Sequence, residues 1–334
     1  MLLDTPTLYY RAFFALPDSI TAPDGRPVNA VRGTLDFISH LVTHHRPDKL
    51  IACFDADWRP AFRVELLPSY KAHRVVEELT EPVSGAGSKS VEEVPDTLTP
   101  QVSMLLEVLA AFGIADGWAP GFEADDAIAA YAALHRAGDG GEVDVVTGDR
   151  EMPGYEPVRV QVVTGDRDLF QLVDDASGVQ VLNIAKGVAK LEVMDDAAIH
   201  AKYNLVGGRA YADFAVLRGD PSDGLPGVAG VGEKTAAALI NEYGSLAGLL
   251  AALDDPGSSL KPAVRKKLNE ASGYLAVAPD VVRVRDDAPV TKVESALPTS
   301  SAHPEQLDEL AERYGLSGPI KRLQKALTAG SAPA

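Results

Sequence analysis

The stretch Lys49-Leu-Ile-Ala-Cys-Phe-Asp55 decides the fold, because it is an unbroken apolar run that ends abruptly on an acid. Such a run is typical of a strand buried on both faces of a parallel sheet, where the alternation of apolar and polar residues is lost. Similar apolar runs predict strands at residues 2–3, 143–147, 158–164 and 179–184. The chain therefore contains several short, buried strands.

Helical patterns lie between these runs. Residues 101–112 fit a helix with Thr99 as its N-cap, Pro100 at its first position and Gly113 as its stop. Residues 124–137 fit a further helix, which begins with acids and is followed by a glycine. Strands that alternate with helices predict an α/β fold with a mostly parallel central sheet flanked by helices.

Three other stretches are assigned from their composition. Residues 195–253 are predicted to be helical, apart from a glycine-rich turn at residues 219–232. Residues 81–99 are rich in Pro, Gly, Ser and Glu, which indicates a mobile loop. Residues 328–334 read Thr-Ala-Gly-Ser-Ala-Pro-Ala and are predicted to be a disordered tail.

The overall composition is that of a globular protein: of 334 residues, 46% are hydrophobic and 24% are charged. The one cysteine, Cys53, excludes an intramolecular disulfide and a zinc site built from cysteines, and its apolar surroundings predict a core residue. The sequence shows no signal peptide and no apolar run long enough to cross a membrane. We therefore expect a soluble, cytoplasmic monomer with no membrane partner.

The charge balance restricts the possible partners. The chain has 31 basic and 48 acidic residues, a net charge of −17, and a negative field of this kind repels phosphate. A nucleic-acid partner is therefore possible only if many of the acids are neutralised by cations. The basic residues must also be grouped locally, and two groups occur, at residues 58–74 and 261–269.

Acids cluster where the predicted strands end and helices begin. Nine of them follow this pattern: Asp4, Asp55, Glu123, Asp125, Asp126, Asp166, Asp168, Asp220 and Asp223. In an open α/β sheet the functional crevice lies outside the carboxyl ends of the strands, so these acids should converge there.

So many carboxylates cannot share one crevice in ionised form without cations, because each raises the pKa of the others. Hard divalent ions such as Mg²⁺ or Mn²⁺ prefer oxygen ligands, and a pair of ions can activate water for phosphodiester hydrolysis. One acid after a strand is usually only a helix cap, and acids in a first helical turn are favoured by the helix dipole. Several such placements in one chain predict a metal site instead.

The glycine-rich turn Leu225-Pro-Gly-Val-Ala-Gly-Val-Gly-Glu-Lys-Thr235 opens a helix. Glycines allow backbone amides to approach a ligand, and the free N–H groups of a helix start bind phosphate. A dinucleotide-binding motif also contains such glycines, but it requires a preceding strand, which is missing from this sequence. The turn therefore favours a hairpin between helices that holds one nucleic-acid strand without reading its sequence.

These motifs, taken in order, resemble the 5′-nuclease superfamily, and in particular stand-alone bacterial flap endonucleases/5′→3′ exonucleases of the actinobacterial type, akin to the nuclease domain of DNA polymerase I. The resemblance covers residues 2–285. It is carried by Leu3-Asp-Thr-Pro-Thr-Leu-Tyr-Tyr-Arg-Ala-Phe, Cys53-Phe-Asp55, Phe62-Arg63, Tyr70-Lys71-Ala-His-Arg74, Gly121-Phe-Glu-Ala-Asp-Asp126, Thr164-Gly-Asp-Arg-Asp-Leu-Phe-Gln-Leu172 and the run from Gly219 to Thr235.

The resemblance implies a PIN-like 5′-nuclease fold with a helical arch and a helix-three-turn-helix region. It implies a nuclease core at residues 1–194 with the arch at about 58–100, the helix-three-turn-helix region at 195–285 and a C-terminal helical segment at 286–327. The implied activity is two-metal hydrolysis of DNA at 5′-flaps, nicks or gaps, for Okazaki-fragment processing and repair.

The resemblance also implies roles for individual residues. Asp4, Asp55, Glu123 and Asp125 would surround one metal ion, and Asp125, Asp166, Asp168 and Asp220 a second. Asp126 and Asp223 would lie beside them near an outer third ion. Lys71 and Arg74 would contact the scissile phosphate, with Asp125 and Asp166 completing the catalytic set. DNA contacts would come from Arg11, Arg63, Tyr70 (stacking on an unpaired base), Lys71, Arg74, Gly227, Gly230, Gly232, Lys234 and Thr235, with a K⁺ ion at the glycine turn.

The chain departs from the family pattern at three places. The family usually has Asn where this chain has Gly224, so a side-chain contact is lost there. Residues 143–159 resemble an insertion that repeats Val-Val-Thr-Gly-Asp-Arg, which stands at 145–150 and again at 162–167. The second copy supplies a second acid and a helical start, whereas Pro-Gly follows the first, so Asp149 is predicted to lie in a loop. No polymerase domain follows the nuclease, so a separate protein would carry out synthesis.

Two other functions compete with this interpretation. Phe54-Asp-Ala-Asp-Trp58 imitates the motif of a haloacid-dehalogenase phosphatase, but Trp58 stands where that family has Thr or Val, and the glycine turn would have no role. A catalytically inactive DNA-junction-binding protein would lack metal ligands, and none is missing from this sequence.

Overall fold

The central sheet is the framework of the computed structural model, which describes residues 1–78, 90–92, 95–136 and 159–330. Its strand order is β5-β2-β1-β6-β7-β8. The strands are β1 (Leu2–Asp4), β2 (Ile51–Cys53), β5 (Ala115–Gly117), β6 (Val160–Thr164), β7 (Val179–Asn183) and β8 (Glu192–Met194). All neighbours pair in parallel except β7 and β8, which are antiparallel.

Strand β1 lies between β2 and β6, so the chain leaves it first toward one side of the sheet and later returns on the other. Asp4 is level with Cys53 on β2, and Leu3 is level with Val163 on β6. The carboxyl ends of these three strands therefore meet at one edge. A reversal of strand order of this kind is where ligands bind in open α/β sheets.

The core lies on both faces of the sheet. Leu2, Ile51 and Val162 belong to one buried cluster, whereas their chain neighbours Leu3 and Ala52 belong to the other. Successive side chains of a strand point to opposite faces, so an unbroken apolar run fills both layers. This explains why the stretch at residues 49–55 contains no polar alternation.

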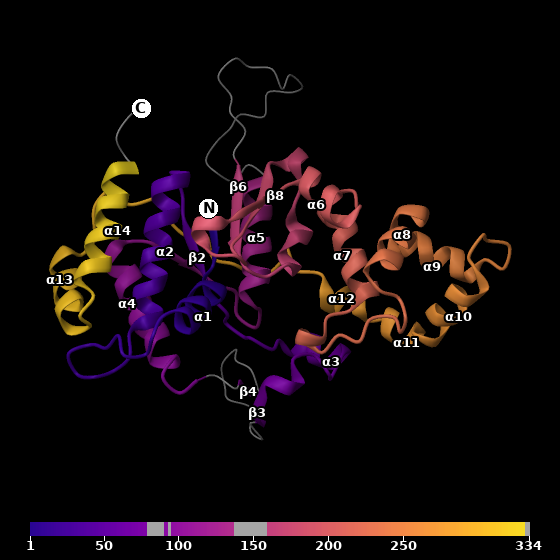
Figure 1. Cartoon of the computed structure of the whole chain (residues 1–334), viewed down its shortest axis with the longest axis horizontal. Coiled ribbons are helices and arrows are strands. Elements are labelled where there is room, and N and C mark those ends of the chain that lie inside the picture. The colour runs from indigo at the N-terminus through magenta and orange to yellow at the C-terminus, as the bar shows by residue number, and fades with distance from the viewer. Residues whose placement is uncertain (79–89, 93–94, 137–158, 331–334) are drawn as a thin grey trace, which may run out of the picture.

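Helices cover both layers (Figure 1). One layer contains α1 (Thr5–Ala15), α2 (Asn29–His45), α4 (Thr99–Phe112), α13 (Pro304–Arg313) and α14 (Ser317–Gly330). The other contains α5 (Ala124–Arg136), α6 (Asp196–Tyr203) and α7 (Gly207–Arg218).

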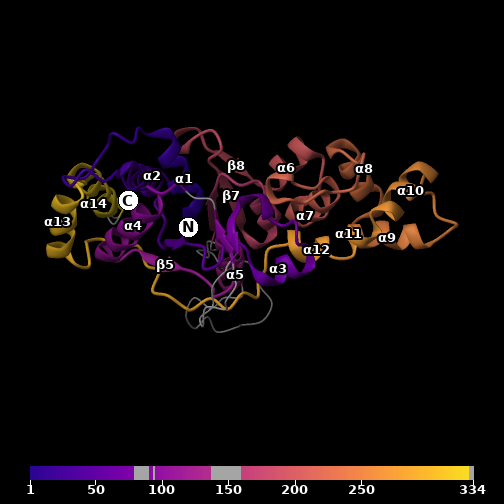
Figure 2. The same ribbon diagram turned by 90° about the horizontal axis from the view of Figure 1, so that it is seen from below.

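The remaining helices extend away from the sheet. They are α3 (Ala61–Leu66), α8 (Glu233–Tyr243), α9 (Leu246–Asp254), α10 (Pro262–Glu270), α11 (Ser272–Leu275) and α12 (Ala278–Val282). Figures 1 and 2 show α8, α9 and α10 at one end of an elongated molecule, with α13 and α14 at the other.

The predicted α/β architecture is confirmed, with corrections to some element ends. The strand in residues 49–55 is limited to Ile51–Cys53, and the helix after Leu98 already includes Thr99, which was predicted to be its cap. The helix α14 continues through residue 330, so the predicted tail begins too early. The predicted strand at 143–147 lies outside the described residues.

The segment predicted to form a helical arch is built differently where the structure describes it. After α3 comes a short 3-10 turn, η1 (Ala72–Arg74), and then an antiparallel pair of strands, β3 (Val75–Glu78) and β4 (Ser90–Glu92). Pairing with β3 also corrects the assignment of residues 90–92 to a loop. The rest of the predicted loop up to residue 94 lies outside the described residues.

Among the residues that the structure describes, no single helix has the length and apolar character needed to cross a membrane. Helices α8 and α9 reach that length only together, across a bend of 78°.

Candidate nuclease site

The predicted acids lie where strands of the sheet end or helices begin. Asp4 ends β1 and caps α1, while Asp55 follows β2. The group around Asp125 opens α5, and Asp166 follows β6. Asp220 caps the 3-10 turn η5 (Pro221–Asp223) after α7. The tertiary structure therefore brings segments separated by more than two hundred residues to one edge of the sheet.

Asp4 is held in place by two threonines. Its Oδ2 accepts hydrogen bonds of 2.5 Å from both the Thr7 and the Thr164 hydroxyls, and its Oδ1 accepts one from the Thr7 N–H at 3.1 Å. Thr164 Oγ1 also accepts from the Asp166 N–H at 2.8 Å. Burial raises the pKa of Asp4 in spite of these bonds, and nearby Asp166 raises it further.

The predicted acids at this edge of the sheet are called the acidic cluster below, and burial raises the pKa of several more of them. Burial and the charges of Asp4 and Asp166 raise the pKa of Asp125 well above its usual value. Crowding by protein atoms raises the pKa of Asp55 to about 7, although its side chain remains open to solvent. Burial, with Asp166 next, raises the pKa of Asp168 to about 8. Burial is the main cause of these shifts, and repulsion between neighbouring acids adds to it.

Glu123 has a different environment, because cations surround it. Arg63 and Lys71 form short ion pairs with its carboxylate, and the Tyr70 hydroxyl donates a 2.7 Å hydrogen bond to Oε2. Burial alone would raise the pKa of Glu123, but Lys71 and Arg63 outweigh burial and hold this pKa below its usual value. Glu123 is therefore ionised and fully partnered in this structure.

Asp126 is a structural residue in this arrangement, which corrects its prediction as a metal ligand. Its side chain is buried, and both oxygens accept from Arg63 at 2.6 and 2.7 Å. The N–H of Arg285 also donates to Oδ1, at 2.9 Å. With both oxygens occupied by protein donors, Asp126 ties α5 to α3 and to the chain after α12.

Arginines also reach the acids near η5. Asp220 Oδ2 is 2.9 Å from Arg167 Nη2 and 3.4 Å from Arg218 Nη2. Burial would raise the pKa of Asp220, but hydrogen bonds from Ser222 and Arg167 lower it below its usual value. Asp223 pairs with Arg74 at 2.8 Å. Arg218 also lies 3.6 Å from Asp168 Oδ1, a buried oxygen without a hydrogen-bond partner among the described residues.

The donors at this edge fit hard divalent cations. They are carboxylate oxygens, and burial, with repulsion from neighbouring acids, raises the pKa of Asp4, Asp55, Asp125 and Asp168. Asp168 Oδ1 is also a buried oxygen without a hydrogen-bond partner among the described residues. As the side chains lie, however, no three acids, histidines or cysteines of the described residues converge on one point. The ion pairs of Glu123 and Asp223 with Lys71 and Arg74 keep those carboxylates turned toward protein cations.

The structure corrects two predicted DNA contacts. Arg63 is 2% exposed and donates from Nε to the Val281 carbonyl at 3.0 Å, so it is an interior residue. Tyr70 is 5% exposed with its hydroxyl on Glu123, and its ring offers no open face to a base. Arg59, from the same basic group, is also buried, so residues 58–74 do not form the expected basic surface.

Lys71 and Arg74, in contrast, lie at the edge of the acidic cluster. Arg74 is in η1, and Lys71 immediately precedes it with a left-handed backbone, φ +48°. Both are partly exposed and pair with acids of the cluster. Arg11, a further predicted DNA contact, lies on α1 and is half-buried.

The glycine turn lies between η5 and α8. Gly227 is buried against the Arg218 carbonyl, whereas Gly230, Gly232, Lys234 and Thr235 are exposed. Lys267 of α10 donates to the Gly230 carbonyl at 2.7 Å, which connects the second basic group to this turn.

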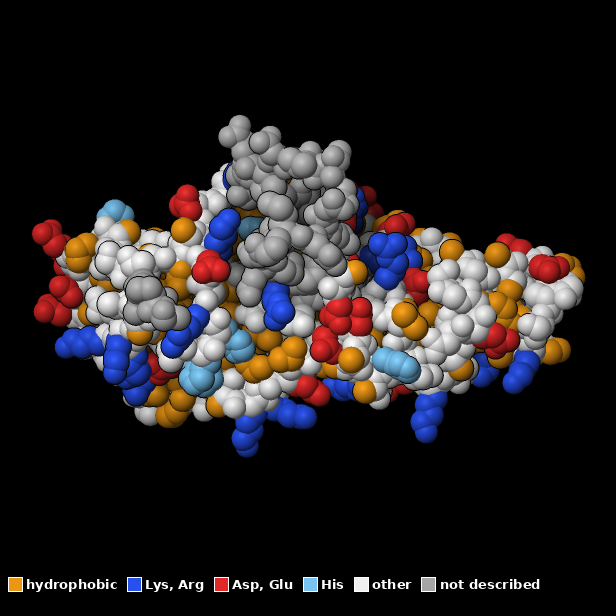
Figure 3. Space-filling view, turned by 90° about the horizontal axis from the view of Figure 1, so that it is seen from above, with side chains coloured by type: hydrophobic (Ala, Val, Ile, Leu, Met, Phe, Trp, Pro, Cys, Tyr) orange, Lys and Arg blue, Asp and Glu red, His pale blue; other side chains and the backbone are white. Residues whose placement is uncertain are grey.

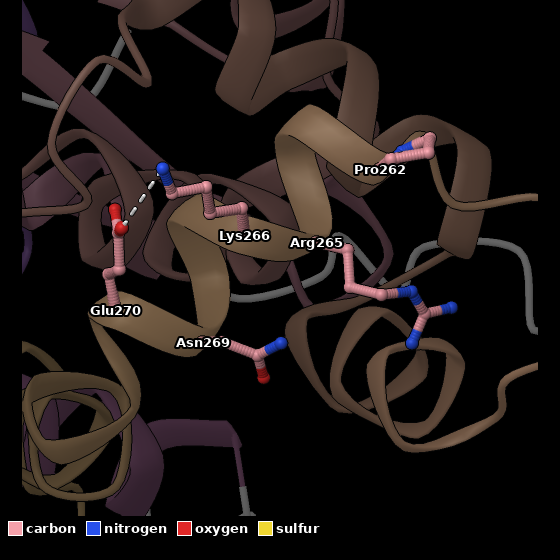
Figure 4. A pocket seen from close by; sticks show the side chains of 5 residues that line it. All are labelled: Pro262, Arg265, Lys266, Asn269 and Glu270. Carbon is pink, nitrogen blue, oxygen red and sulfur yellow. Dashed lines mark ion pairs between the residues drawn. The ribbon is translucent and has the colours of Figure 1, made fainter.

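Helix α10 also borders an open hollow of about 510 Å³ (Figure 4). Lys266 lies 3.8 Å from Glu270 there, so the cation is partly neutralised by its own helix. Figure 3 shows acidic and basic side chains interspersed on the face that it presents, with single Lys and Arg side chains projecting from its edge. The described part of this face therefore presents no continuous basic surface to a polyanion.

Sequence reasoning missed the residues that position these acids. Thr7 and Thr164 hold Asp4, while Arg167 and Arg218 reach Asp220. Their signal was their place within two or three residues of a predicted acid.

The family of the chain follows from comparison with known proteins. A family model described as "5′-3′ exonuclease, N-terminal resolvase-like domain" matches residues 1–155, and one described as "5′-3′ exonuclease, C-terminal SAM fold" matches residues 206–305. A 5′-3′ exonuclease of Streptomyces coelicolor is 55% identical over 98% of this chain and 100% of its own length. A 5′-3′ exonuclease of Mycobacterium tuberculosis is 50% identical over 98% of this chain and 97% of its own length.

More distant proteins agree with this assignment. The DNA polymerase I of M. tuberculosis is 40% identical over 80% of this chain, which corresponds to 25% of the polymerase. The structure of a bacteriophage T5 flap endonuclease in complex with DNA and metal ions matches with a TM-score of 0.58 and 18% identity. The match covers 99% of this chain and 98% of the T5 chain. The catalytic core of Rad2 in complex with a DNA substrate matches with a TM-score of 0.57 and 18% identity. The match covers 99% of this chain and 92% of the Rad2 chain. These two structures identify the PIN-like 5′-nuclease fold, and the identity of the two exonucleases over their whole length shows that the chain is a nuclease of the 5′-3′ exonuclease family.

Proposed function

We propose that this nuclease is structure-specific: a 5′-flap endonuclease and 5′→3′ exonuclease that hydrolyses DNA phosphodiesters in Okazaki-fragment processing and repair. One observation carries the proposal. Carboxylates from five chain segments gather at the reversal of strand order, and the two partly exposed cations Lys71 and Arg74 border them. A site of this kind can bind both cations and a phosphate.

The metal requirement is part of the proposal. Mg²⁺ or Mn²⁺ ions bound there would supply the positive charge that activates water and stabilises the leaving oxygen of the phosphodiester. One ion would be held by Asp4, Asp55, Glu123 and Asp125. A second ion would be held by Asp125, Asp166, Asp168 and Asp220, and Asp223 would lie near an outer third ion. Asp125 would belong to both sets.

The cations of the chain would act on the phosphate. Lys71 lies against Glu123 and Arg74 against Asp223, so both are within a side chain's reach of the cluster. We propose that these side chains turn from the carboxylates to the scissile phosphate when DNA binds, and neutralise the charge that develops on its oxygens. A well-placed donor of this kind is worth about 3–4 kcal/mol in the transition state.

The glycine turn would hold the duplex. Backbone amides near Gly230 and Gly232, the start of α8, Lys234 and Thr235 are exposed and suited to one phosphate backbone, without reading the base sequence. A K⁺ ion at this turn is part of the proposal, as are a monomeric, cytoplasmic enzyme associated with the nucleoid and a separate polymerase.

A labelled double-flap DNA, with the product sized to one nucleotide, tests the proposal. Cleavage should require Mg²⁺ or Mn²⁺ and stop with EDTA, and Asp125→Ala should abolish it while duplex binding remains. A protein that binds the junction but never cuts it would contradict the proposal, and so would near-normal cleavage by Asp125→Ala.

A small phosphate ester provides the comparison with the haloacid-dehalogenase alternative, and we expect no hydrolysis of it. Asp57, the second acid of the imitated motif, is 6% exposed and accepts a 3.0 Å hydrogen bond from the Arg59 N–H. Its burial does not suit a residue that must meet a substrate.

A further inference from the structure

Two distant segments of the chain are docked on each other beside the acidic cluster. The Lys71 N–H donates to the Asp223 carbonyl at 3.0 Å, and the Ser69 hydroxyl donates to the Gly224 carbonyl at 2.9 Å. Arg74 Nη2 donates to the Ser222 carbonyl at 2.9 Å. The segment 69–74, which carries both proposed phosphate-binding cations, is therefore attached to the backbone of the turn that carries Asp223.

Gly224 lies in the middle of this contact. A Cβ added to it would be 2.0 Å from the Ser69 carbonyl oxygen and 3.4 Å from the Lys71 nitrogen. Because the obstacle at 2.0 Å is backbone, no change of rotamer can relieve it. The φ of Gly224 is +72°, a conformation that Asn adopts more readily than most other non-glycine residues. The short distance, more than the backbone angle, is therefore what requires glycine.

The segment is also held from its other side. Arg59 is buried and donates from Nε to the Tyr70 carbonyl at 2.7 Å and from Nη2 to the Pro68 carbonyl at 3.0 Å. Lys71 is one of the few described non-glycine residues with a positive φ, and such a conformation persists only when the surroundings enforce it. The Gly224 contact is one of those enforcing elements.

We propose that Gly224 is a positioning residue: the absence of a side chain there lets the segment 69–74 dock on the turn at 220–225 and holds Lys71 and Arg74 at the acidic cluster before DNA arrives. The inference rests on the proposed function, in which these two cations act on the scissile phosphate. It gives the departure from the family's Asn a physical role, because Asn at this position would need the segment to lie further away.

Gly224→Asn tests the proposal, with Gly25→Asn as its matched control. Gly25 has φ +88° and no atom within 4 Å of an added Cβ, so this control measures the cost of a side chain at positive φ without a collision. The first readout is hydrogen exchange at the Lys71 amide in the metal-free, DNA-free protein. It should accelerate on the order of 10-fold in Gly224→Asn, because a backbone hydrogen bond is lost, and should stay unchanged in Gly25→Asn.

The second readout is kinetic. Single-turnover cleavage by Gly224→Asn should fall on the order of 10²-fold, as expected for misplaced catalytic groups, while its affinity for flap DNA in Ca²⁺ changes little. The same substitution made in Lys71→Ala should cost less, because one of the two residues being positioned is already absent.

Unchanged exchange at Lys71 in a folded Gly224→Asn protein would overturn the proposal. So would faster exchange with a normal cleavage rate, provided that Lys71→Ala is slow. If Lys71→Ala itself cleaves normally, the proposed role of Lys71 fails, but the exchange measurement still decides whether Gly224 controls docking. If Gly224→Asn does not fold, Ser69→Ala takes its place, because it removes one docking hydrogen bond without adding an atom. Ser69→Ala should accelerate hydrogen exchange at the Lys71 amide by a smaller factor. Unchanged exchange at that amide would count against docking.

Discussion

Replacement of Arg63 by alanine separates a structural role from a DNA-binding role. Arg63 is 2% exposed and pairs with Glu123 and with both oxygens of Asp126. It also donates to the Val281 carbonyl at 3.0 Å, which fastens α3 to α12. Arg63→Ala would leave two buried carboxylates and a buried carbonyl without this cation.

The expected cost is large. Removing one partner of a buried ion pair costs about 3–5 kcal/mol, whereas the whole free energy of unfolding of a typical protein is about 5–15 kcal/mol. Arg322→Ala is the matched control, since Arg322 makes a two-bond pair with Asp36 of 2.8 and 3.0 Å but is half exposed. An exposed pair contributes about 0–1 kcal/mol.

Urea unfolding followed by tryptophan fluorescence measures both variants, because the chain contains Trp58 and Trp118. Arg63→Ala should lower the unfolding midpoint strongly and Arg322→Ala hardly at all. Affinity for flap DNA, measured in Ca²⁺ well below the unfolding midpoint, should be near that of the wild type. A variant that is as stable as the wild type but binds DNA weakly would refute the interior role of Arg63.

Further predictions concern the site and its surroundings. Lys71→Ala should lower the single-turnover rate about 10²–10³-fold with little loss of affinity in Ca²⁺; equal losses in both would assign Lys71 to uniform phosphate binding. Without metal, the free energy of unfolding should fall as the pH rises from about 5 to 8. In the folded state Asp55 and Asp168, with pKa values of about 7 and 8, hold protons that the unfolded chain, with the ordinary Asp pKa of 3.8, has already released. A calorimetric melting temperature independent of pH would contradict this, and saturating Mg²⁺ should reduce the slope. Thr164→Val should weaken Ca²⁺ binding, measured by titration calorimetry, about 10–100-fold, and Thr164→Ser should restore it. Asp149→Ala should cleave within a few-fold of the wild type although Asp166→Ala is inactive and folded by circular dichroism; Asp149 lies outside the described residues, and the reverse outcome would show that the other copy of the repeat supplies the metal ligand.

The local features of the site could be predicted from the sequence. The apolar stretch before Asp55 defines a buried strand, and the acid marks its end. The start of α5 at Ala124 and the turn before α8 follow from residues within a few positions of each other. Short strands without a distinct pattern, such as β5 and β8, were missed, because three residues contain too little periodicity to identify a strand.

Other properties were decided only by the tertiary structure. Arg63, Tyr70 and Asp126 have the composition of a nucleic-acid and metal site, yet they are interior residues. Arg63 donates to the carbonyl of Val281, 218 residues further along the chain, and Asp126 in turn accepts from Arg63. No local pattern contains such a contact, so residue type alone could not separate these residues from Lys71 and Arg74.

The role of Gly224 also depends on a long-range contact that the sequence does not display. In the sequence it is only a departure from a family pattern, whereas in the structure its hydrogen atom faces the Ser69 carbonyl, where a Cβ would be 2.0 Å away. Strand ends, caps and turns are determined by interactions between neighbours in the chain, which the sequence displays directly. Burial, ion pairing and close approach depend on which distant segments the fold brings together, and for this protein those long-range contacts decide which charged residues are interior and which stay partly exposed.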